Sequence, residues 1–324
     1  MRAPSKTNSE FHLIEKLFAP HADAKTAGHL RDDAASYTPT PGHDLVISTD
    51  MLVSGVHFPA NATAEVVAAR LVGSNISDLA AKSAKPVGCL LNLAISEAWD
   101  LPFLTDFASH LGAALAAYEM PLWGGDTVQS QQASVSLSVY GELPSGTMIT
   151  RAGAQIGDDV YVTGVIGDGF LGLQHALAGT RGDSLAAYHA PRPPLLFGQK
   201  LRGLASSCLD ISDGLAADLD HLCASSHTAM QVTLTDIPLS PEGQAYATNA
   251  ETLADLLSGG DDYQLAFTAA ADKAAPLAAL AAQNQLRLSK IGTVKKPVQD
   301  RFEAAFVDGS GQILTLHRRG YQHF

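Results

Sequence analysis

Leu45-Val-Ile-Ser-Thr-Asp50 precedes the long segment Thr63–Ser83, TAEVVAARLVGSNISDLAAKS, and the two have the patterns of a strand and a helix. The first is a short apolar run, which predicts a buried strand over 45–49 that ends at Asp50. The second carries its apolar residues on one helical face, namely Val66, Val67, Leu71, Ile76 and Leu79. A strand followed by an amphipathic helix indicates an α/β fold.

Similar patterns continue along the chain and predict two α/β domains. Residues 88–95 are apolar, and Ser134-Val-Ser-Leu-Ser-Val-Tyr140 alternates strictly, so both segments predict strands. Pro144-Ser145-Gly146 is a turn signal and the best boundary. A chain of 324 residues is long enough for two domains of about 150 residues each. We therefore expect one domain over 1–145 and another over 146–324.

Composition excludes several classes of protein. The chain has 33 acidic and 21 basic residues, a net charge of -12, and no basic cluster larger than a pair, which argues against nucleic acid and membrane surfaces as partners. No apolar run approaches 18 residues, and the first ten residues are polar, so we expect neither a membrane span nor a signal peptide. Cys89, Cys208 and Cys223 are far apart in sequence and predict buried, reduced thiols in a cytoplasmic protein.

Aspartates recur at the ends of predicted strands and at turns, often beside glycine. These residues are Asp32, Asp33, Asp50, Asp78, Asp126, Asp210, Asp213, Asp261 and Asp262. In open α/β sheets the site lies beyond the carboxyl ends of the strands. Carboxylate oxygens are the ligands that Mg²⁺ prefers, and a substrate phosphate often completes its coordination. The pattern therefore favours a shared magnesium site.

Each aspartate also has a purely structural interpretation, because Asp commonly caps helices and stabilises turns. Asp213, just before a leucine-periodic segment, is open to that interpretation. Asp78 is harder to explain in this way, because it lies inside the predicted helix beside apolar residues. A carboxylate in that position needs a cation or strong hydrogen-bond donors.

Motif searches narrow the chemistry. The chain has no Gly-Lys pair, so a P-loop is excluded, and it has no protein-kinase signature and no G-x-S-x-G. One G-x-G-x-x-G occurs at Gly167–Gly172, but no second strand ending in an acidic residue follows at the spacing that dinucleotide binding requires. We expect this turn to pack a helix close to its strand, and a dinucleotide-binding oxidoreductase remains the alternative.

Eight segments, taken in order, resemble the thiamine-monophosphate kinases, a family within the superfamily of aminoimidazole ribonucleotide synthetase. They are Glu10–Ile14, Ser48–His57, Asn75–Ala81, Gly124–Thr127, Thr150–Ala154, Asp210–Leu215, Leu257–Tyr263 and Gly320–Phe324. The resemblance implies transfer of the γ-phosphoryl group of ATP to thiamine monophosphate, giving thiamine diphosphate. It also implies a homodimer, whose N-terminal domains pair their sheets, with ATP in a cleft between the two domains.

The resemblance also implies the roles of individual residues. The implied Mg²⁺ ligands are Asp33, Ser48, Thr49, Asp50, Asp78, Asp126, Asp210 and Asp213. The implied ATP contacts are Gly125, Asp126, Arg151 and Ser212. The implied contacts with thiamine monophosphate are His57 and Asp261. No covalent or general-base residue is expected, because the acceptor phosphate is already anionic at neutral pH.

Three positions depart from the family pattern. Arg31 replaces a glycine before the first aspartate pair, Asp261 replaces a glutamate, and Arg318 replaces an aromatic residue that stacks on the substrate. We expect Asp261 and Arg318 to weaken substrate binding and to leave the chemistry intact. Another phosphate monoester as acceptor, and a non-catalytic nucleotide-binding module, remain open as alternatives.

Overall fold

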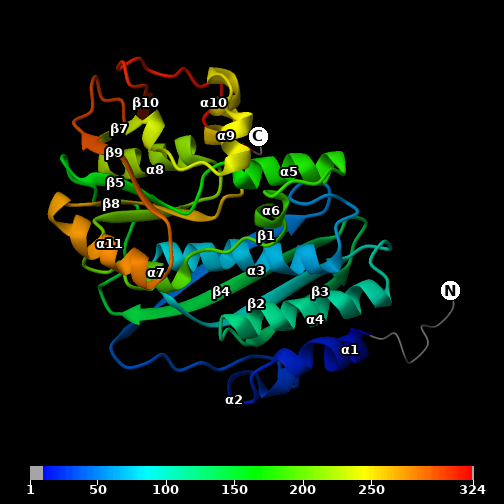
Figure 1. Cartoon of the computed structure of the whole chain (residues 1–324). Coiled ribbons are helices and arrows are strands. Elements are labelled where there is room, and N and C mark those ends of the chain that lie inside the picture. Colours follow the sequence, from blue (N-terminus) through cyan, green and yellow to red (C-terminus); the bar gives the residue numbers. More distant parts are fainter. Residues whose placement is uncertain (1–9, 323–324) are drawn as a thin grey trace. The chain divides into compact units, whose positions relative to one another are not determined.

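The computed structural model describes residues 10–322, and its chain divides into two compact units. Unit 1 comprises the chain up to Ile76 together with Lys85–Ser145, and unit 2 comprises Ser77–Ala84 together with Gly146 onwards. Each unit contains one sheet and several helices, so the predicted mixed α/β architecture with two sheets is confirmed (Figure 1). The second unit also takes residues 77–84, which the sequence did not indicate.

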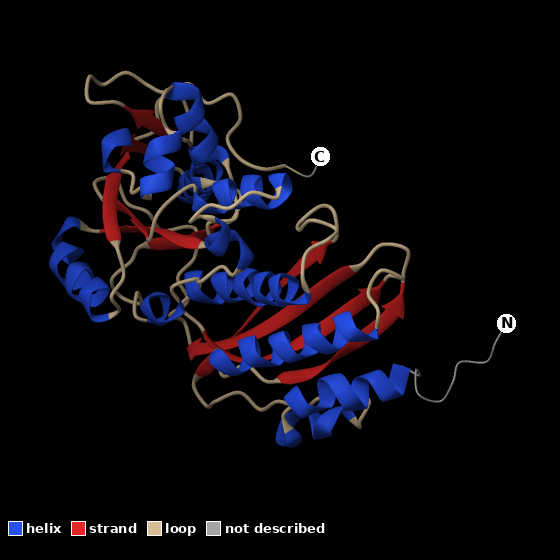
Figure 2. Cartoon of the chain, turned by 45° about the vertical axis from the view of Figure 1, so that its right-hand side comes forward, coloured by secondary structure: helices blue, strands red, loops and turns tan. Residues whose placement is uncertain are grey.

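Unit 1 is a four-stranded sheet with the strand order β1-β4-β2-β3. Its elements are α1 (Glu10–Leu13), η2 (Ile14–Phe18), η3 (Ala19–His21), α2 (Ala24–Ala27), η4 (Gly28–Leu30), β1 (His43–Val53), α3 (Ala64–Ala81), β2 (Lys85–Ile95), α4 (Leu101–Ala117), β3 (Leu122–Gln129) and β4 (Ser134–Pro144). The last residues of α3 belong to unit 2. In both ribbon views α3 and α4 run alongside each other over the sheet (Figures 1 and 2).

Alternation along the strands of unit 1 separates a buried face from an open one. Leu137 and Val139 of β4 and Leu91 of β2 are buried, as are Leu71 of α3 and Phe107 of α4. The opposite face exposes large apolar side chains, namely Leu45, Ile47 and Met51 of β1. Since side chains of a strand alternate between faces, α3 and α4 pack on the opposite side of the sheet from Leu45, Ile47 and Met51.

Unit 2 is a six-stranded sheet with the order β10-β7-β9-β5-β8-β6. Its elements are β5 (Asp159–Thr163), α5 (Asp168–Ala178), α6 (Leu185–His189), α7 (Leu195–Gln199), β6 (Ser207–Ile211), α8 (Leu215–Ser226), β7 (Ala229–Thr233), η5 (Leu234–Asp236), α9 (Pro241–Tyr246), α10 (Ala250–Ser258), β8 (Gln264–Ala269), η6 (Ala271–Lys273), α11 (Ala274–Gln283), β9 (Leu288–Lys295) and β10 (Ala304–Val307). Its core joins β5, β6 and β9 to Leu215, Leu219 and Leu222 of α8, which are all fully buried.

The sheets correct one step of the sequence argument. Both are largely antiparallel, and among the named strands of residues 10–322 the parallel pairs are β2 with β3 and β7 with β10. The carboxyl ends of neighbouring strands therefore do not gather at one edge. The strand predicted over 45–49 also continues to Val53, so Asp50 lies inside β1, and Asp126 lies inside β3. Regular strand pairing extends both elements past the expected ends.

The structure also tests the expectations about the cysteines and about membrane-spanning helices. All three cysteines are free and buried, as predicted, and burial raises the pKa of each thiol to about 12. Within residues 10–322, none of the helices combines the length and apolar character needed to cross a lipid bilayer.

Candidate functional site

The turn between β6 and α8 in unit 2 is held by one buried carboxylate. Oδ2 of Asp218 accepts three successive backbone N–H groups, from Ser212 at 3.0 Å, Asp213 at 3.0 Å and Gly214 at 3.1 Å. Asp218 lies in the first turn of α8, where negative charge is favoured by the helix dipole. Gly214 has φ 122°, a conformation that L side chains rarely adopt. The local sequence thus fixes the direction in which the turn presents Ser212 and Asp213.

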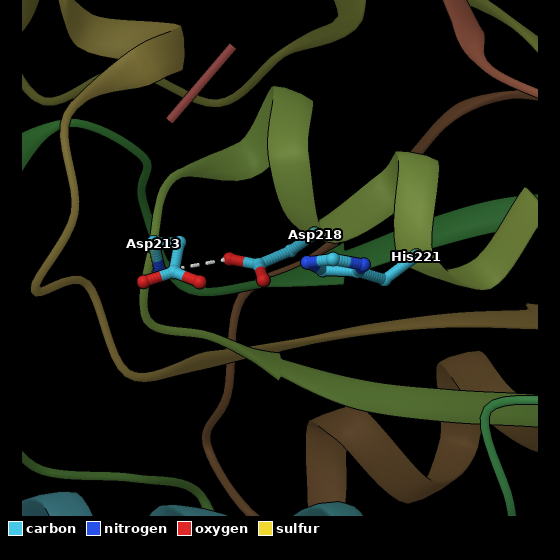
Figure 3. Close-up of side chains that lie close together, drawn as sticks. All are labelled: Asp213, Asp218 and His221. Carbon is cyan, nitrogen blue, oxygen red and sulfur yellow. Dashed lines mark hydrogen bonds between the residues drawn. The ribbon is translucent and has the colours of Figure 1, made fainter. Parts of the chain in front are cut away.

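Three carboxylates gather at this turn. The pKa of Asp218 is raised well above its ordinary value, chiefly by burial and then by the charges of Asp210 and Asp213. Figure 3 shows Asp213 beside Asp218, with His221 of α8 next to it. Ligand atoms of Asp213, Asp218 and His221 all lie within 4.8 Å of one another, a spacing that could hold a metal ion. Such a concentration of negative charge favours a hard cation.

The loop before β8 packs directly on this turn. The backbone N–H of Asp261 donates to the carbonyl of Ser212 at 2.9 Å. A Cβ on Gly260 would lie 2.3 Å from that same carbonyl oxygen, so only glycine allows this approach. Asp261 itself has φ 75°, and its Oδ1 accepts the hydroxyl of Tyr263 at 3.1 Å. The structure therefore brings the predicted substrate residue Asp261 next to the predicted ATP contact Ser212.

The C-terminal segment reaches the same place. Tyr321 donates its backbone N–H to the carbonyl of Asp213 at 3.0 Å, and the hydroxyl of Ser258 donates to the carbonyl of Arg318 at 2.7 Å. Arg319 anchors the segment through a bidentate ion pair with Asp220, in which its Nε lies 2.7 Å from Oδ2. Arg318 is exposed, so its guanidinium can extend toward a ligand.

The G-x-G-x-x-G turn has a structural role. Both carboxylate oxygens of Asp262 accept the N–H of Gly167, at 3.0 and 2.9 Å, and Oδ1 also accepts the N–H of Gly169 at 3.0 Å. In a dinucleotide-binding fold such N–H groups face the pyrophosphate. Here a protein carboxylate holds them at the beginning of α5, which removes the structural support for the oxidoreductase alternative.

In unit 1, a pocket of about 680 Å³ brings Asp33, Gly125 and Asp126 to one place. Its wall includes an aromatic cluster in which the Trp123 ring lies 4.6 Å from the Tyr37 ring and 5.2 Å from the Tyr140 ring, centroid to centroid. Acidic groups beside flat apolar walls suit a ligand with both an aromatic ring and bound cations.

Ser48, Thr49 and Asp50 of β1 do not line that pocket. Asp50 and Asp126 lie on opposite edge strands of the sheet, three strand spacings or roughly 14 Å apart. The backbone N–H of Asp50 donates to Asn75 Oδ1 of α3 at 3.1 Å. Thr49 faces the other side of β1, where its hydroxyl donates to the carbonyl of Leu137 at 2.9 Å. The Thr49 hydroxyl therefore cannot meet one ion together with the side chains of Ser48 and Asp50.

His57 has a defined tautomer. Its Nδ1 accepts the backbone N–H of Val53 at 3.0 Å, so the proton of the neutral ring resides on Nε2. This hydrogen bond fixes the ring at the turn that follows β1. A fixed N–H donor at this position suits a phosphate oxygen.

Arg31 does not distort its loop. It adopts φ -105°, a conformation open to any residue, and its guanidinium lies 3.8 Å from the carboxylate of Glu15 on the surface. The position therefore does not require glycine, and Asp33 still lines the pocket.

Comparison with known proteins decides the family. Residues 31–143 match the family AIR synthase related protein, N-terminal domain, and residues 155–303 match AIR synthase related protein, C-terminal domain. A thiamine-monophosphate kinase of Caulobacter vibrioides is 36% identical over 97% of this chain and 91% of its own length. The chain belongs to the thiamine-monophosphate kinase family.

Solved structures of the family have the same fold. A thiamine-monophosphate kinase of Stenotrophomonas maltophilia aligns with a TM-score of 0.79 at 32% identity, covering 86% of this chain and 89% of its own. The structure of AaThiL complexed with AMPPCP and TMP aligns over 100% of both chains, with a TM-score of 0.77 and 25% identity. These thiamine-monophosphate kinases support the enzyme class, a phosphotransferase, that the sequence predicted.

The sequence did not predict the role of Asp218 or the hydrogen-bond partners of Asp262. Asp218 falls on the same face of α8 as the buried Leu215, Leu219 and Leu222, and an acidic residue within an apolar stripe is the signal that would have revealed it. Asp262 was visible only as the second member of an aspartate pair. Its partners Gly167 and Gly169 are more than 90 residues away, and no local pattern predicts that contact.

Asp262 makes the stability of this enzyme depend on pH. Burial raises its pKa from 3.8 to about 7, the N–H bonds from Gly167 and Gly169 oppose this shift without cancelling it, and the charges of Asp168 and Asp261 add smaller increases. Between pH 4 and 7 the folded state therefore holds a proton that the unfolded state has lost, so stability falls as pH rises through this window. We expect Asp262→Asn to gain on the order of 2 kcal/mol relative to the wild type between pH 5 and 7.

Urea unfolding at a series of pH values measures this difference. Asp308→Asn is the control, because hydrogen bonds from Ser310 and Gln312 lower the pKa of Asp308. Its difference from the wild type should stay constant from pH 5 to 7. A constant difference for Asp262→Asn as well would show that Asp262 is ionised throughout.

Proposed function

We propose that this chain phosphorylates thiamine monophosphate with ATP and releases thiamine diphosphate and ADP. The observation that carries the proposal is that three distant segments meet in unit 2. They are the turn held by Asp218, the loop at Asp261 and the tail at Arg318 and Tyr321. The complex of AaThiL with AMPPCP, an ATP analogue, and TMP supports both substrates.

The donor set fits magnesium. The proposed ligands offer only oxygen atoms, and the crowding of Asp210 and Asp213 around Asp218 supplies the negative charge that a divalent cation offsets. Bound Mg²⁺ supplies charge neutralisation to the phosphates. The residues proposed to hold magnesium are Asp33, Ser48, Asp50, Asp78, Asp126, Asp210 and Asp213, and they bind more than one ion, because Asp50 and Asp126 lie on opposite edge strands. Thr49 is also a proposed ligand, but of a different ion from Ser48 and Asp50, because its hydroxyl lies on the other face of β1.

The reaction is proposed as direct, in-line transfer. The acceptor is already a phosphate anion, so no general base is needed, and the protein has to position two anions that repel each other. Gly125, Asp126, Arg151 and Ser212 are the proposed ATP contacts. The exposed guanidinium of Arg151 can make two parallel hydrogen bonds to a phosphate. The placement of ATP between the two domains rests on the family resemblance.

The substrate end is proposed to comprise His57, Asp261 and Arg318. The fixed Nε2–H of His57 is a donor for the substrate phosphate. Asp261 is one methylene shorter than the glutamate of the family, and Arg318 cannot attract a thiazolium cation as an aromatic ring would. We therefore expect a higher KM for thiamine monophosphate than a glutamate and an aromatic residue would give.

A homodimer is proposed for unit 1. Ile47 is 62% exposed, and Leu45 and Met51 share its face of the sheet. Burying a large apolar side chain contributes about 1.5–3 kcal/mol, so a second copy that covers this face gains stability. We further propose that the protein acts in the cytoplasm, where its thiols remain reduced.

The function is tested by a magnesium-dependent kinase assay of the full chain. Thiamine monophosphate should be converted to thiamine diphosphate with ATP present, and removal of Mg²⁺ with a chelator should abolish turnover. Thiamine and a set of other phosphate monoesters serve as competing acceptors. Faster turnover of another monoester would replace the proposed substrate, and an absence of transfer to every acceptor would leave only a nucleotide-binding module.

Ile47→Glu tests the dimer. Light scattering of the wild type should give twice the chain mass of 33.9 kDa, and the charged variant should shift to the monomer, because it places a carboxylate in the apolar interface. Leu177→Glu, equally exposed but at the end of α5 in unit 2, is the control and should remain dimeric. A monomeric wild type contradicts the proposal.

A further inference from the structure

Strand β6 ends the sheet of unit 2, and two basic residues meet its free edge at Cys208. The backbone N–H of Cys208 donates to the carbonyl of Thr150 at 3.0 Å, which places Arg151 beside this strand. The carbonyl of Cys208 accepts the ammonium of Lys82 at 3.0 Å. Lys82 follows α3 and belongs to unit 2, as Arg151 does. Both hydrogen bonds are made by the backbone of Cys208, so Lys82 and Arg151 are neighbours at this edge.

Two carboxylates accompany them. The backbone N–H of Lys82 donates to the carbonyl of Asp78 at 3.0 Å, so Asp78 and Lys82 lie one helical turn apart on the same face. Asp210 lies two residues beyond Cys208 on β6, on the same side of the strand. Lys82 therefore lies beside two of the residues proposed to hold magnesium.

The charges of these groups influence one another. Burial lowers the pKa of Lys82, the positive charge of Arg151 adds to this effect, and Asp210 and Asp78 oppose it. Among the described residues, the carbonyl of Cys208 is the one hydrogen-bond acceptor of the Lys82 ammonium. The Arg151 guanidinium is exposed and makes no hydrogen bond or ion pair within residues 10–322. An ammonium has three donors and a guanidinium five, so both retain the capacity to bind an anion.

Two like charges side by side are unfavourable unless something of opposite sign is bound between them. The carboxylates Asp78 and Asp210 balance the pair in charge, but they are also the oxygen ligands that a magnesium ion requires. When they bind the metal, the two cations need another anion. Among the groups in a phosphoryl-transfer site, phosphate oxygens meet that need best.

We propose that Lys82 and Arg151 together bind one phosphate group at the free edge of β6. This rests on the proposed function, which supplies two sources of phosphate: ATP and the phosphorylated acceptor. Lys82 is thus a substrate-contacting residue as well as a connection between the end of α3 and β6. A connection alone would need only a hydrogen-bond donor, whereas phosphate binding needs the charge.

Calorimetric titration of the full chain in Mg²⁺ distinguishes phosphate binding by Lys82 from a purely structural role of this residue, and it needs no turnover. AMPPCP is the probe for the nucleotide phosphate, and thiamine monophosphate, added to the protein saturated with AMPPCP, is the probe for the acceptor phosphate. Lys82→Met removes the charge at similar length, and Lys82→Arg keeps it. Lys85→Met is the matched control, because Lys85 lies three residues away on the surface, 3.4 Å from Glu119. If Lys82→Met does not fold by circular dichroism, Lys82→Gln takes its place and keeps a donor for Cys208.

Lys82→Met should weaken binding of one of the two probes by roughly tenfold or more, because a hydrogen bond to a charged group is lost. Lys82→Arg should retain most of the affinity, and Lys85→Met should match the wild type. Unchanged affinity for both probes in Lys82→Met would overturn the proposal. Equal loss in Lys82→Arg and Lys82→Met would also overturn it, since charge would then be irrelevant. A wild type that binds AMPPCP but phosphorylates no thiamine monophosphate would refute the proposed function and leave the nucleotide test of Lys82 valid.

Discussion

One carboxylate oxygen, Oδ2 of Asp218, organises the site of unit 2. It accepts the backbone N–H groups of Ser212, Asp213 and Gly214, so the turn after β6 has one defined conformation. Carbonyl groups of this turn accept the backbone N–H groups of Asp261 and Tyr321. These hydrogen bonds fix the loop before β8 and the C-terminal segment. A buried carboxylate is costly, and three backbone donors and the N-terminus of α8 offset only part of that cost, so the pKa of Asp218 stays raised.

The charged groups of unit 2 are arranged in a way that suits phosphoryl transfer. Carboxylates that favour a divalent cation gather at the Asp218 turn, whereas Lys82 and Arg151 meet at the free edge of β6. In unit 1, Asp33 and Asp126 line an aromatic pocket. Phosphoryl transfer depends on positioning and electrostatic stabilisation more than on covalent participation of the protein. A framework that holds the proposed metal-binding carboxylates beside the proposed phosphate-binding cations meets both requirements.

Much of this arrangement could be predicted from the sequence, because some signals are local. The apolar face of α3, the alternation along β4 and the aspartates beside glycines each follow from neighbouring residues. Strand order depends on contacts between distant parts of the chain. We therefore expected Asp50 and Asp126 in one shared site, although they lie on opposite edges of one sheet. The contact of Asp262 with Gly167 and the approach of Lys82 to Cys208 join residues about 95 and 126 positions apart. Such contacts follow from tertiary packing, which no periodicity records.

We propose that Asp218 holds the turn in the conformation that binds the nucleotide. The most direct measurement is the affinity of Asp218→Ala for AMPPCP in Mg²⁺, determined by calorimetry beside the wild type at a temperature where both are folded. Loss of the acceptor leaves three N–H groups without a partner and frees the turn, so we expect the affinity for AMPPCP to fall by roughly tenfold or more. Equal affinity in a folded Asp218→Ala variant would show that nucleotide binding does not depend on the turn held by Asp218.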